Sequence, residues 1–436
     1  MKNTYSEMKD SGIAWIGAVP SNWGVLPART AFYEVKEKNF DGKYTRQLSF
    51  RYGQIVDKVG NSATTEAENE TATAYRVVTP KTIMINGLNL NYDFISQRVA
   101  MVKDHGIITS AYLAVKAKEE LMISEYSLYL FKSYDGKQVF HGHGSGVRKT
   151  LKFSDFREIP VVIPSLPEQT AIAAYLDEKC GTIDKIIAEA KASIEEYKAW
   201  KSSVIFEAVT KGLNPNAEMK DSGVEWIGKV PRHWKMTKTK FCSSKIGSGK
   251  TPRGGAEIYT DSGVMILRSQ NIYNTGLMLD NVSYISEEID EEMANSRVFE
   301  DDILLNITGG SIGRCCIYPA NFPHANVNQH VCIIRVIKDI MIPKLMLYIW
   351  MSDVGQKSID ICQTGANREG MNFEQIGNTI IPLMAYTEQQ AIVNYLDEKC
   401  AAIDGIIAEK ESLIADMEAY KKSLIFETVT GKRKVC

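Results

Sequence analysis

Two segments of the chain each occur twice, and this duplication restricts the fold more than any other feature of the sequence. Residues 8–23 (MKDSGIAWIGAVPSNW) and 219–234 (MKDSGVEWIGKVPRHW) agree at 11 of 16 positions. Residues 175–189 and 395–409 agree at 12 of 15 positions. The offsets are 211 and 220 residues, about half of the 436-residue chain. The chain is therefore two copies of one plan, each with a short opening segment, a body and a helical tail.

The two bodies, residues 31–160 and 241–382, have little sequence in common. Both contain short runs of β-branched residues separated by Gly and Asn, which is typical of strands. A shared frame with different inserts predicts an α+β protein with two α/β domains, each built on mixed β-sheets and related by a pseudo-two-fold internal repeat. Such a protein would present two surfaces with different specificities. The predicted strands are Thr82–Ile85, Val99–Val102, Val264–Leu267, Ile303–Ile307 and Val331–Val336.

Each tail has the apolar 3-4 spacing of a coiled-coil helix. Ser165 with Glu168, and Thr387 with Gln390, have the spacing of a capping box, and Gly212 is a stop signal. About 44 residues at 1.5 Å per residue make each helix roughly 65 Å long. We expect the two helices to pack antiparallel as a coiled coil and to hold the two bodies apart. The predicted seam is Leu176, Ile183, Ile187, Ile194, Tyr197, Val204, Leu396, Ile403, Ile407, Ile414, Met417 and Leu424.

The domain boundaries follow from this plan. Residues 1–164 form the first variable domain and residues 165–214 the central helix. Residues 215–385 form the second variable domain, and residues 386–436 form the C-terminal helix.

Composition argues against several classes of protein. The longest apolar run, Leu345–Met351, is far shorter than the roughly 20 residues of a membrane span, and the polar N-terminus does not resemble a secretion signal. We therefore expect a cytoplasmic protein without membrane contact. The eight cysteines include no Cys-x-x-Cys pair and the six histidines are scattered, so we expect free thiols and no metal site.

The charge of the chain is small but unevenly distributed. A formal net charge of −2 is not the footprint of a nucleic-acid-binding protein. Residues 229–254, however, contain eight basic side chains and no acidic ones. Such a run is usually a solvated face, and it can also contact phosphate groups.

The junction between body and tail carries a motif with the pattern I-P-x-P-x-x-E-Q-x-x-I-x-x-Y-L-D. The first copy runs from Ile163 to Asp177, and the second keeps Ile381-Pro382, Glu388-Gln389, Ile392 and Tyr395-Leu396-Asp397. This pattern resembles the junction of recognition domain and conserved helix in the specificity subunits of Type I restriction-modification systems. The W-I-G-x-V-P-x-x-W openings and the segments 249–252, 266–272, 301–305 and 309–313 are similar to the same family.

The resemblance implies a protein that has no catalysis of its own and binds no cofactor. It would recognise a bipartite double-stranded DNA target, one half-site for each target recognition domain. Its partners would be two adenine methyltransferase subunits and two restriction subunits, which would use S-adenosylmethionine, ATP and Mg. The long helices would act as spacer and as docking surface for the methyltransferases.

Base recognition needs Arg or Lys for guanine and Asn or Gln for adenine, on segments that reach a groove, while cations and hydroxyls contact phosphates. Two Gly-containing loops, residues 141–150 and 363–370, stand at equivalent places before the two junctions. We expect both to contact DNA, with Arg148 and Arg368 each acting on its own half-site. The DNA-contact candidates in the first body are Arg46, Arg51, Asn86, Asn89, Arg98, His141, His143, Ser145, Arg148 and Lys149. Those in the second body are Lys250, Arg253, Arg268, Gln270, Asn271, Thr308, Arg314, Asn367 and Arg368.

Two other classes of function stay open at this point. The chain could be a coiled-coil scaffold that binds proteins through both bodies and never contacts DNA. It could also be an ATPase, because residues 244–251 (SKIGSGKT) nearly spell a phosphate loop. Ser244 replaces the first Gly, and Pro252 opposes the helix that must follow the loop, so we expect no nucleotide site there.

Overall fold

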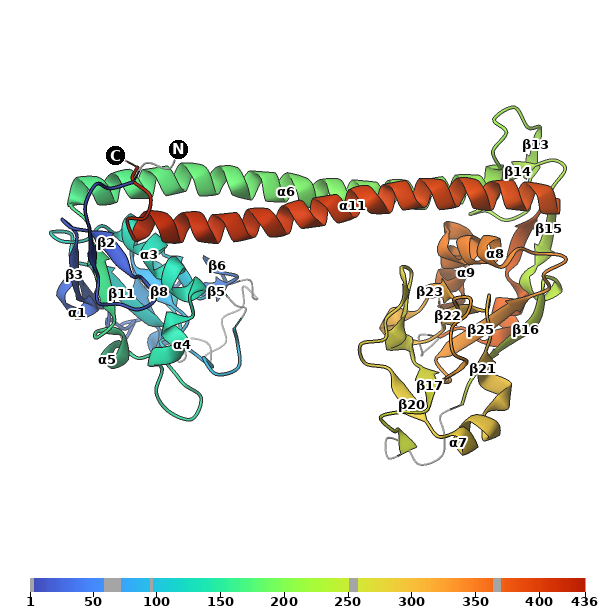
Figure 1. Cartoon of the computed structure of the whole chain (residues 1–436), viewed down its shortest axis with the longest axis horizontal. Coiled ribbons are helices and arrows are strands. Elements are labelled where there is room, and N and C mark those ends of the chain that lie inside the picture. Colours follow the sequence, from blue (N-terminus) through green and yellow to red (C-terminus); the bar gives the residue numbers. More distant parts are fainter. Residues whose placement is uncertain (1–3, 59–71, 95–96, 251–257, 364–369, 436) are drawn as a thin grey trace. The chain divides into compact units, whose positions relative to one another are not determined.

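The chain folds into two compact units. The structure, a computed structural model, describes residues 4–58, 72–94, 97–250, 258–363 and 370–435. Unit 1 consists of residues 1–191 and 411–436, and unit 2 consists of residues 192–410 (Figure 1). Helix α6 (Leu166–Lys211) begins in unit 1 and ends in unit 2, while α11 (Tyr386–Val429) begins in unit 2 and ends in unit 1. Each unit therefore contains one body and parts of both long helices. The four predicted domain boundaries stay a prediction.

Both units are built on the same four-stranded antiparallel sheet. The strand order is β4-β11-β8-β9 in unit 1 and β16-β25-β22-β23 in unit 2. The last two strands of each sheet have the same register, with Ile83 opposite Met101 and Ile303 opposite Ile317. All five predicted strands are present, with slightly different ends. The strands are β4 (Phe32–Glu34), β8 (Ile83–Ile85), β9 (Val99–Met101), β11 (Leu113–Ala117), β16 (Ser243–Ser248), β22 (Ile303–Asn306), β23 (Cys315–Ile317) and β25 (Val331–Val336).

The opening segments form matching hairpins. Met8 pairs with Pro20 in one hairpin and Met219 pairs with Pro231 in the other, and each hairpin is followed by a fully buried Trp, Trp23 or Trp234. The strand after each hairpin pairs antiparallel with the strand that leads into the long helix. These strands are β1 (Met8–Asp10), β2 (Ala18–Pro20), β3 (Gly24–Pro27), β12 (Pro160–Ile163), β13 (Met219–Asp221), β14 (Lys229–Pro231), β15 (Lys235–Lys238) and β26 (Ile380–Leu383).

The remaining strands differ between the two units. Unit 1 adds the pairs β5–β6 and β7–β10, whereas unit 2 adds a second four-stranded sheet of order β20-β17-β24-β21, in which β17 and β24 are parallel. The strands of unit 1 are β5 (Leu48–Arg51), β6 (Gln54–Asp57), β7 (Arg76–Val78) and β10 (Gly106–Ile108). Those of unit 2 are β17 (Val264–Leu267), β18 (Ile272–Tyr273), β19 (Gly276–Leu277), β20 (Ser283–Ile285), β21 (Arg297–Val298) and β24 (Ala325–Val327).

Short helices complete each body. Unit 1 contains α1 (Ala28–Ala31), α3 (Ser124–Gly136), α4 (Val139–His143) and α5 (Phe153–Phe156). Unit 2 contains η1 (Thr239–Phe241), η3 (Ser269–Asn271), α7 (Glu287–Glu292), η4 (Ala294–Ser296), η5 (Gly309–Ser311), α8 (Pro343–Met351), α9 (Asp353–Gln363) and α10 (Phe373–Asn378).

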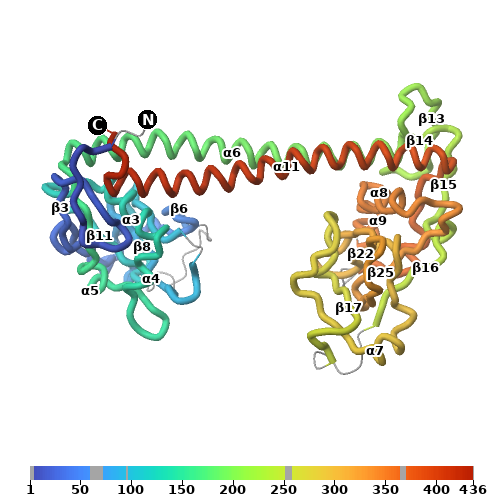
Figure 2. The backbone as a smooth tube through the Cα atoms, in the orientation of Figure 1, coloured from blue at the N-terminus to red at the C-terminus, as the bar shows by residue number. Residues whose placement is uncertain are grey.

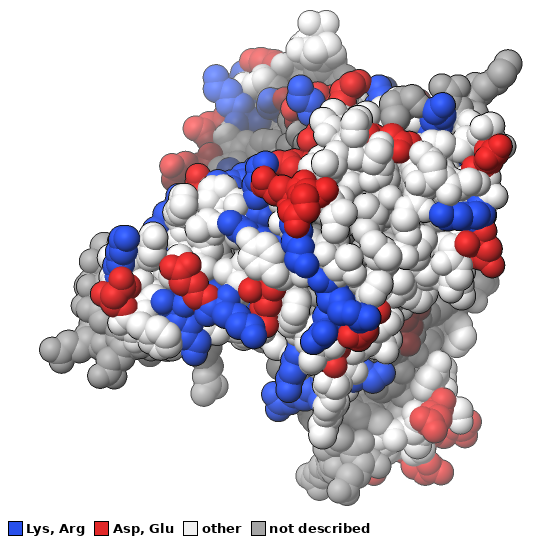
Figure 3. Space-filling view, turned by 90° about the vertical axis from the view of Figure 1, so that its left-hand side faces the viewer, with Lys and Arg blue, Asp and Glu red and all other residues white. Residues whose placement is uncertain are grey.

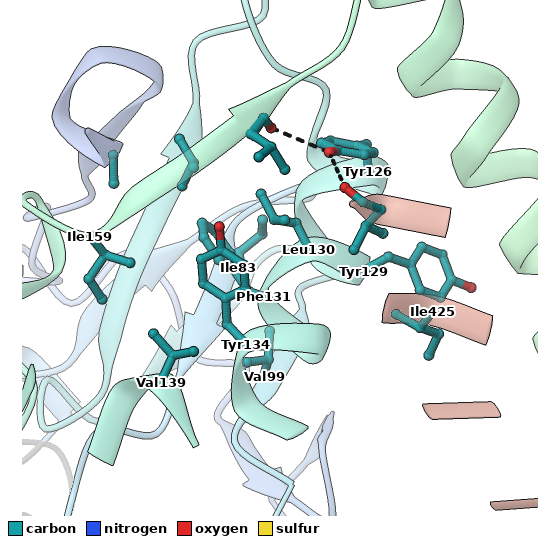
Figure 4. Close-up of a cluster of buried hydrophobic side chains, with 14 of the residues drawn as sticks. Ile83, Val99, Tyr126, Tyr129, Leu130, Phe131, Tyr134, Val139, Ile159 and Ile425 are labelled. Atoms are coloured by element: carbon teal, nitrogen blue, oxygen red, sulfur yellow. Dashed lines mark hydrogen bonds between the residues drawn. The ribbon is translucent and has the colours of Figure 1, made fainter. Parts of the chain in front are cut away.

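The core of unit 1 joins its sheet to α3 and to the end of α11. Leu130 and Phe131 of α3 are fully buried against Ile83 of the sheet (Figure 4). The Tyr126 hydroxyl donates to Val162 O at 3.3 Å and lies 3.0 Å from Val429 O, so one buried phenol connects a strand with the last residue of α11. Burial raises the pKa of Tyr126 well above its usual value, which keeps the hydroxyl protonated as a donor.

The polar residues of the junction motif anchor the start of each long helix. The buried Gln169 side chain accepts from Ile123 N–H at 2.8 Å and donates to Leu121 O and Pro164 O at 2.8 and 2.9 Å. In unit 2, Gln389 makes the same three bonds. The motif Asp accepts from a tyrosine hydroxyl in both units, from Tyr129 to Asp177 at 2.7 Å and from Tyr348 to Asp397 at 2.6 Å. The Gln of the motif is thus required because buried backbone groups need partners.

Parts of α6 and α11 pack antiparallel within each unit. Lys421 is 2.6 Å from an Asp184 oxygen in unit 1, and Lys201 is 2.6 Å from an Asp404 oxygen in unit 2, so the numbering rises along one helix as it falls along the other. Of the predicted seam, Leu176, Ile183, Ile187, Ile194, Leu396, Ile403 and Leu424 are buried, while Tyr197, Val204, Ile407, Ile414 and Met417 are half-buried.

The ends of the helices match two of the three sequence signals. Glu168 accepts from the N–H and the hydroxyl of Ser165, at 3.3 and 2.9 Å, as the first capping box predicts. Gly212 ends α6 with a φ of +70°. The second capping box, Thr387 with Gln390, is wrong, because α11 already begins at Tyr386 and Thr387 lies inside it. The repeat shows the reason: Ala385 stands in the place of Ser165, so no side chain is available there to cap the helix.

The segment after α11 packs on the hairpin of unit 1. Lys432 Nζ donates to Ala18 O at 3.2 Å, and a Cβ on Gly431 would lie 2.2 Å from Pro20. Figure 2 shows the backbone of this C-terminal segment beside the N-terminal part of the chain. In unit 2, Gly212 after α6 approaches Trp234 in the same way, with 3.1 Å from a Cβ to the ring. Each opening hairpin is therefore covered by the end of the long helix that follows the other body.

Candidate nucleic-acid interface

Two loops of unit 1 are joined at the end of the central strand β8, and we call them loop cluster 1 (residues 86–94 and 141–151). Leu90 N–H donates to Lys149 O at 3.1 Å and Leu151 N–H donates to Gly87 O at 2.9 Å. The Asn91 side chain donates to Val147 O at 3.2 Å. Seven of the ten candidates in this body lie on these two loops, namely Asn86, Asn89, His141, His143, Ser145, Arg148 and Lys149.

Arg98 is fully buried beneath loop cluster 1 and does not face solvent. Its guanidinium donates to the carbonyl oxygens of Asn86 and Leu88 at 2.9 Å and of Asp93 at 2.6 Å. His141 also lies 3.0 Å from Asp93 O, and its ring stacks on Phe94 with the centroids 5.0 Å apart. In this structure Arg98 and His141 therefore hold the loop from inside, because carbonyl groups removed from water need donors.

The second loop ends in a structured turn that presents cations. Ser145 and Thr150 bond to each other through both backbone groups, at 3.2 and 2.9 Å, and Lys149 N–H donates to Gly146 O at 3.0 Å. Asn89, Ser145, Arg148 and Lys149 are exposed, whereas His143 is half-buried with its ring 6.2 Å from Trp15.

The last two candidates of this body lie on the β5–β6 hairpin. Arg46, just before β5, donates two hydrogen bonds to Asp57 at 2.7 and 3.1 Å and one to Asp104 at 3.2 Å, so its charge is already compensated. The Asp57 contact raises the pKa of Arg46 above its usual value. Arg51 is exposed at the end of β5, and the turn that follows it lies against Gln97, the residue before Arg98: a Cβ on Gly53 would lie 2.5 Å from the Gln97 side chain.

Four segments of unit 2 are joined at the corresponding end of β22, and we call them loop cluster 2 (residues 249–250, 268–274, 306–314 and 328–330). Asn328 N–H donates to Leu267 O at 3.1 Å, and Gly249 N–H donates to Asn328 O at 3.2 Å. A Cβ on Gly249 would lie 1.4 Å from Val327 O, so only Gly fits there. Asn306 donates to Ser269 O at 2.9 Å, and Thr308 Oγ1 lies 2.6 Å from Nδ1 of His330.

The candidates Lys250, Arg268, Gln270, Asn271, Thr308 and Arg314 all lie in loop cluster 2. Lys250 and Gln270 are exposed, and Arg314 is half-buried with its guanidinium 4.8 Å from the centre of the Tyr273 ring. Asn271 is buried, caps η3 at Arg268 N–H and donates to Met278 O, so it shapes the loop from inside. Arg253, Asn367 and Arg368 lie outside the described residues.

The two loop clusters occupy the same place in the shared sheet. Asn86 N–H donates to Arg98 O, and Asn306 N–H donates to Arg314 O, both at 2.8 Å. The strand registers therefore make Arg98 and Arg314 equivalent, although their side chains do different things. One is turned inward under its loop, and the other lies on an aromatic ring.

Sequence reasoning missed several residues of these surfaces. Gln329 and His330 belong to loop cluster 2, and the signal for them was the polar run from Asn328 to His330 between two strands. Tyr273 supports Arg314. In unit 1, Tyr52, Tyr92 and Val147 are 91%, 75% and 95% exposed, but a single sequence does not distinguish an exposed aromatic or apolar residue from a buried one.

The basic segment 229–254 is divided by the fold. Lys229, Arg232 and Lys235 lie on the opening hairpin and β15, and Lys245 bonds to Asn295 O, where burial lowers the pKa of the lysine. Of its described basic residues, only Lys250 lies in loop cluster 2. The near-phosphate loop is largely strand β16, paired with β25 along Ser243–Ser248.

Metal binding, cysteine reactivity and membrane crossing are three further properties of the described residues. No group of three or more His, Cys, Asp and Glu side chains there could hold a metal ion. The seven described cysteines are free, and burial raises the pKa of Cys242 to about 11 and those of Cys316 and Cys332 to about 12. No helix in the described ranges is both long and apolar enough to cross a membrane.

The charges on unit 1 are mixed rather than gathered by sign. Figure 3 shows Lys and Arg side chains interspersed with Asp and Glu over the face in view. A contact with phosphates would therefore depend on local cations such as Arg148 and Lys149, since the field of the whole chain is weak at a net charge of −2.

Comparisons with known proteins agree on one family. The specificity subunit of the type I restriction enzyme EcoBI of Escherichia coli is 24% identical over 299 residues, which cover 65% of this chain and 60% of the relative. The EcoKI specificity subunit of Escherichia coli is 21% identical over 333 residues, 74% of this chain and 68% of the relative. The chain thus spans about 60% of the length of the first of these relatives.

A solved chain described under complex assembly and conformational transition of the type I R-M system has a TM-score of 0.70. It is 13% identical, and the match covers 95% of this chain and 99% of that one, so the fold is shared. The family model for the Type I restriction modification DNA specificity domain matches residues 98–196 and 235–413, more than half of the sequence. The chain belongs to the Type I restriction modification DNA specificity domain family.

Proposed function

We propose that this chain is the DNA-recognition subunit of a Type I restriction-modification complex and reads a bipartite double-stranded target. Loop cluster 1 contacts one half-site and loop cluster 2 contacts the other. The chain carries out no reaction and binds no cofactor itself. Two adenine methyltransferase subunits and two restriction subunits dock on it and use S-adenosylmethionine, ATP and Mg.

The observation that carries the proposal is the equivalence of the two loop clusters. Both are placed by the same strand ends, and both are cross-linked by hydrogen bonds between segments that are far apart in the sequence. Each combines donors that suit bases and phosphates, such as Asn89 with Arg148 in unit 1 and Gln270 with Lys250 in unit 2. Two different half-sites require different side chains at equivalent positions of the shared sheet, which is what the two loop clusters provide.

The proposal is tested with the full chain assembled with its methyltransferase subunits. We expect the affinity for random duplex DNA to fall linearly with the logarithm of the salt concentration. A footprint on host DNA should show two protected segments. Arg148→Ala should weaken one segment and Lys250→Ala the other, each lowering the salt slope by about 1. Affinity without salt dependence would favour a protein-binding scaffold, and ATP turnover by the chain alone would favour an ATPase.

We also propose that α6 and α11 set the distance between the half-sites. Deleting seven residues from each helix, 190–196 and 409–415, keeps the heptad seam and the ion pairs Asp184–Lys421 and Lys201–Asp404 in register. At 1.5 Å per residue the deletion shortens each helix by about 10 Å, so the preferred spacer should shorten by about 3 base pairs. The control is deletion of seven residues from α6 alone, which breaks the register. An unchanged spacer in the double deletion would contradict the proposal.

A further inference from the structure

The turn at residues 145–150 presents an apolar side chain that does nothing for the fold. Val147 is 95% exposed. A valine stabilises a fold through the apolar surface that it buries, and this side chain buries almost none. Turns favour Gly, Asn, Asp, Ser and Pro, so a β-branched residue at the tip is not there for backbone reasons.

The turn is nevertheless rigidly held. The backbone bonds between Ser145 and Thr150 close its base, and the Asn91 side chain donates to the carbonyl of Val147 itself. Gly146 and Lys149 both have positive φ, at +82° and +36°, which sets the direction of the tip. Val147 is thus fixed in position by the neighbouring loop, whose own Tyr92 is 75% exposed.

Cations stand directly beside Val147. Arg148 and Lys149 are exposed, and within the described part of the chain no carboxylate forms an ion pair with either. An apolar group followed by two exposed cations matches a DNA groove, where phosphates line both sides and the thymine methyl group is the apolar feature of the major groove.

We propose that Val147 is a specificity-determining residue of unit 1 that contacts the 5-methyl group of a thymine in the major groove, while Arg148 and Lys149 contact the phosphates beside it. The proposal rests on the DNA-binding function proposed above. It assigns base recognition to a side chain that can form no hydrogen bond.

The test begins with duplexes selected from a randomised pool by the complex of the full chain and its methyltransferase subunits. Each thymine of the selected site is then replaced by deoxyuridine, which removes only the methyl group. We expect one replacement, in the half-site that Arg148→Ala weakens, to lower the affinity about fourfold, the factor that corresponds to burying one methyl group. The Val147→Ser complex should bind the thymine and deoxyuridine duplexes equally, and Val147→Ile should restore the difference.

The half-site read by unit 2 is the internal control and should be unchanged in all Val147 variants. If no deoxyuridine replacement affects the wild type, or if Val147→Ser shows the same loss as the wild type, the assignment of Val147 is wrong while DNA recognition stands. If the wild-type complex selects no sequence from the pool, the proposed function itself fails, and this inference fails with it.

Discussion

Units 1 and 2 share one sheet but differ in the loop that follows its central strand. In unit 1 the chain leaves β8 at Asn86 and returns at Arg98, whereas in unit 2 it leaves β22 at Asn306 and returns at Arg314. The longer loop of unit 1 needs a buried guanidinium to satisfy its carbonyl groups. The shorter loop of unit 2 leaves its arginine half-buried on Tyr273. The shared sheet fixes where the two loops lie, and loop length decides which of their side chains are held by the backbone.

The largest expected effect tests whether units 1 and 2 depend equally on the Gln side chain that anchors the start of each long helix. Gln169→Leu and Gln389→Leu should each lower the free energy of unfolding of their own unit by about 4 kcal/mol, because each leaves three buried backbone groups without partners. The measurement is urea unfolding followed by hydrogen exchange in each unit. Gln390→Leu, an exposed change one residue away, is the control and should cost little. A loss confined to one of the two units would break the equivalence of the frames.

The next prediction concerns Arg98 and Arg314, which occupy equivalent positions but are expected to have different roles. Arg98→Ala should lower the free energy of unfolding of unit 1 by about 3 kcal/mol, since three carbonyl groups lose a charged donor. Arg314→Ala should cost unit 2 less than about 1 kcal/mol, the usual size of a cation–π contact at a partly exposed site, and should weaken DNA binding directly. Thermal unfolding and duplex binding of the two variants provide the comparison. Equal losses of stability would contradict the different roles assigned to the two arginines.

The smallest effect concerns acid, to which one carboxylate in each unit should respond with opposite sign; it is half-buried in unit 1 and buried in unit 2. Burial raises the pKa of Asp135, which accepts from Arg98 N–H, above its usual value of about 3.9. Burial also acts to raise the pKa of Asp290, but hydrogen bonds from Arg297 and His324 outweigh it and lower that pKa.

The sign follows from proton linkage. As the pH rises from about 4 through the folded-state pKa of Asp135, the folded form loses a proton that the unfolded form has already lost, so unit 1 becomes less stable. As the pH falls below about 4 through the folded-state pKa of Asp290, unit 2 loses stability. Unfolding against pH should lose the first slope in Asp135→Asn and the second in Asp290→Asn. Slopes of the same sign in both units would contradict this assignment.

Much of the fold could be read from the sequence because its signals are local. The heptad spacing from Leu176 to Val204 requires only the helical repeat, and Gly212 ends the helix by its own backbone conformation. The β-branched runs became strands with small shifts at their ends. The one capping error, at Thr387, arose where Ala385 cannot supply the signal.

The candidate site was readable only in part. The sequence located the segments around Asn86, residues 141–150 and Thr308, and the structure brings them to equivalent strand ends. It could not show that Arg98 and Asn271 point inward. The carbonyl groups to which they donate are brought within reach only by the folded backbone. Nor could it match Arg98 with Arg314: the intervening loops differ in length, and the match depends on the strand register.

The amino-acid sequence alone establishes an internal duplication and two long helices, because repeated segments and heptad spacing are visible without the fold. The tertiary structure shows which loop side chains are exposed to a ligand, such as Val147 and Arg148. It also shows which are buried and hydrogen-bonded to the loop backbone, such as Arg98. The physical reason is that a buried polar group must find its partner wherever the fold supplies one, and the carbonyl groups of Asn86, Leu88 and Asp93 are brought within reach of Arg98 only by the folded backbone.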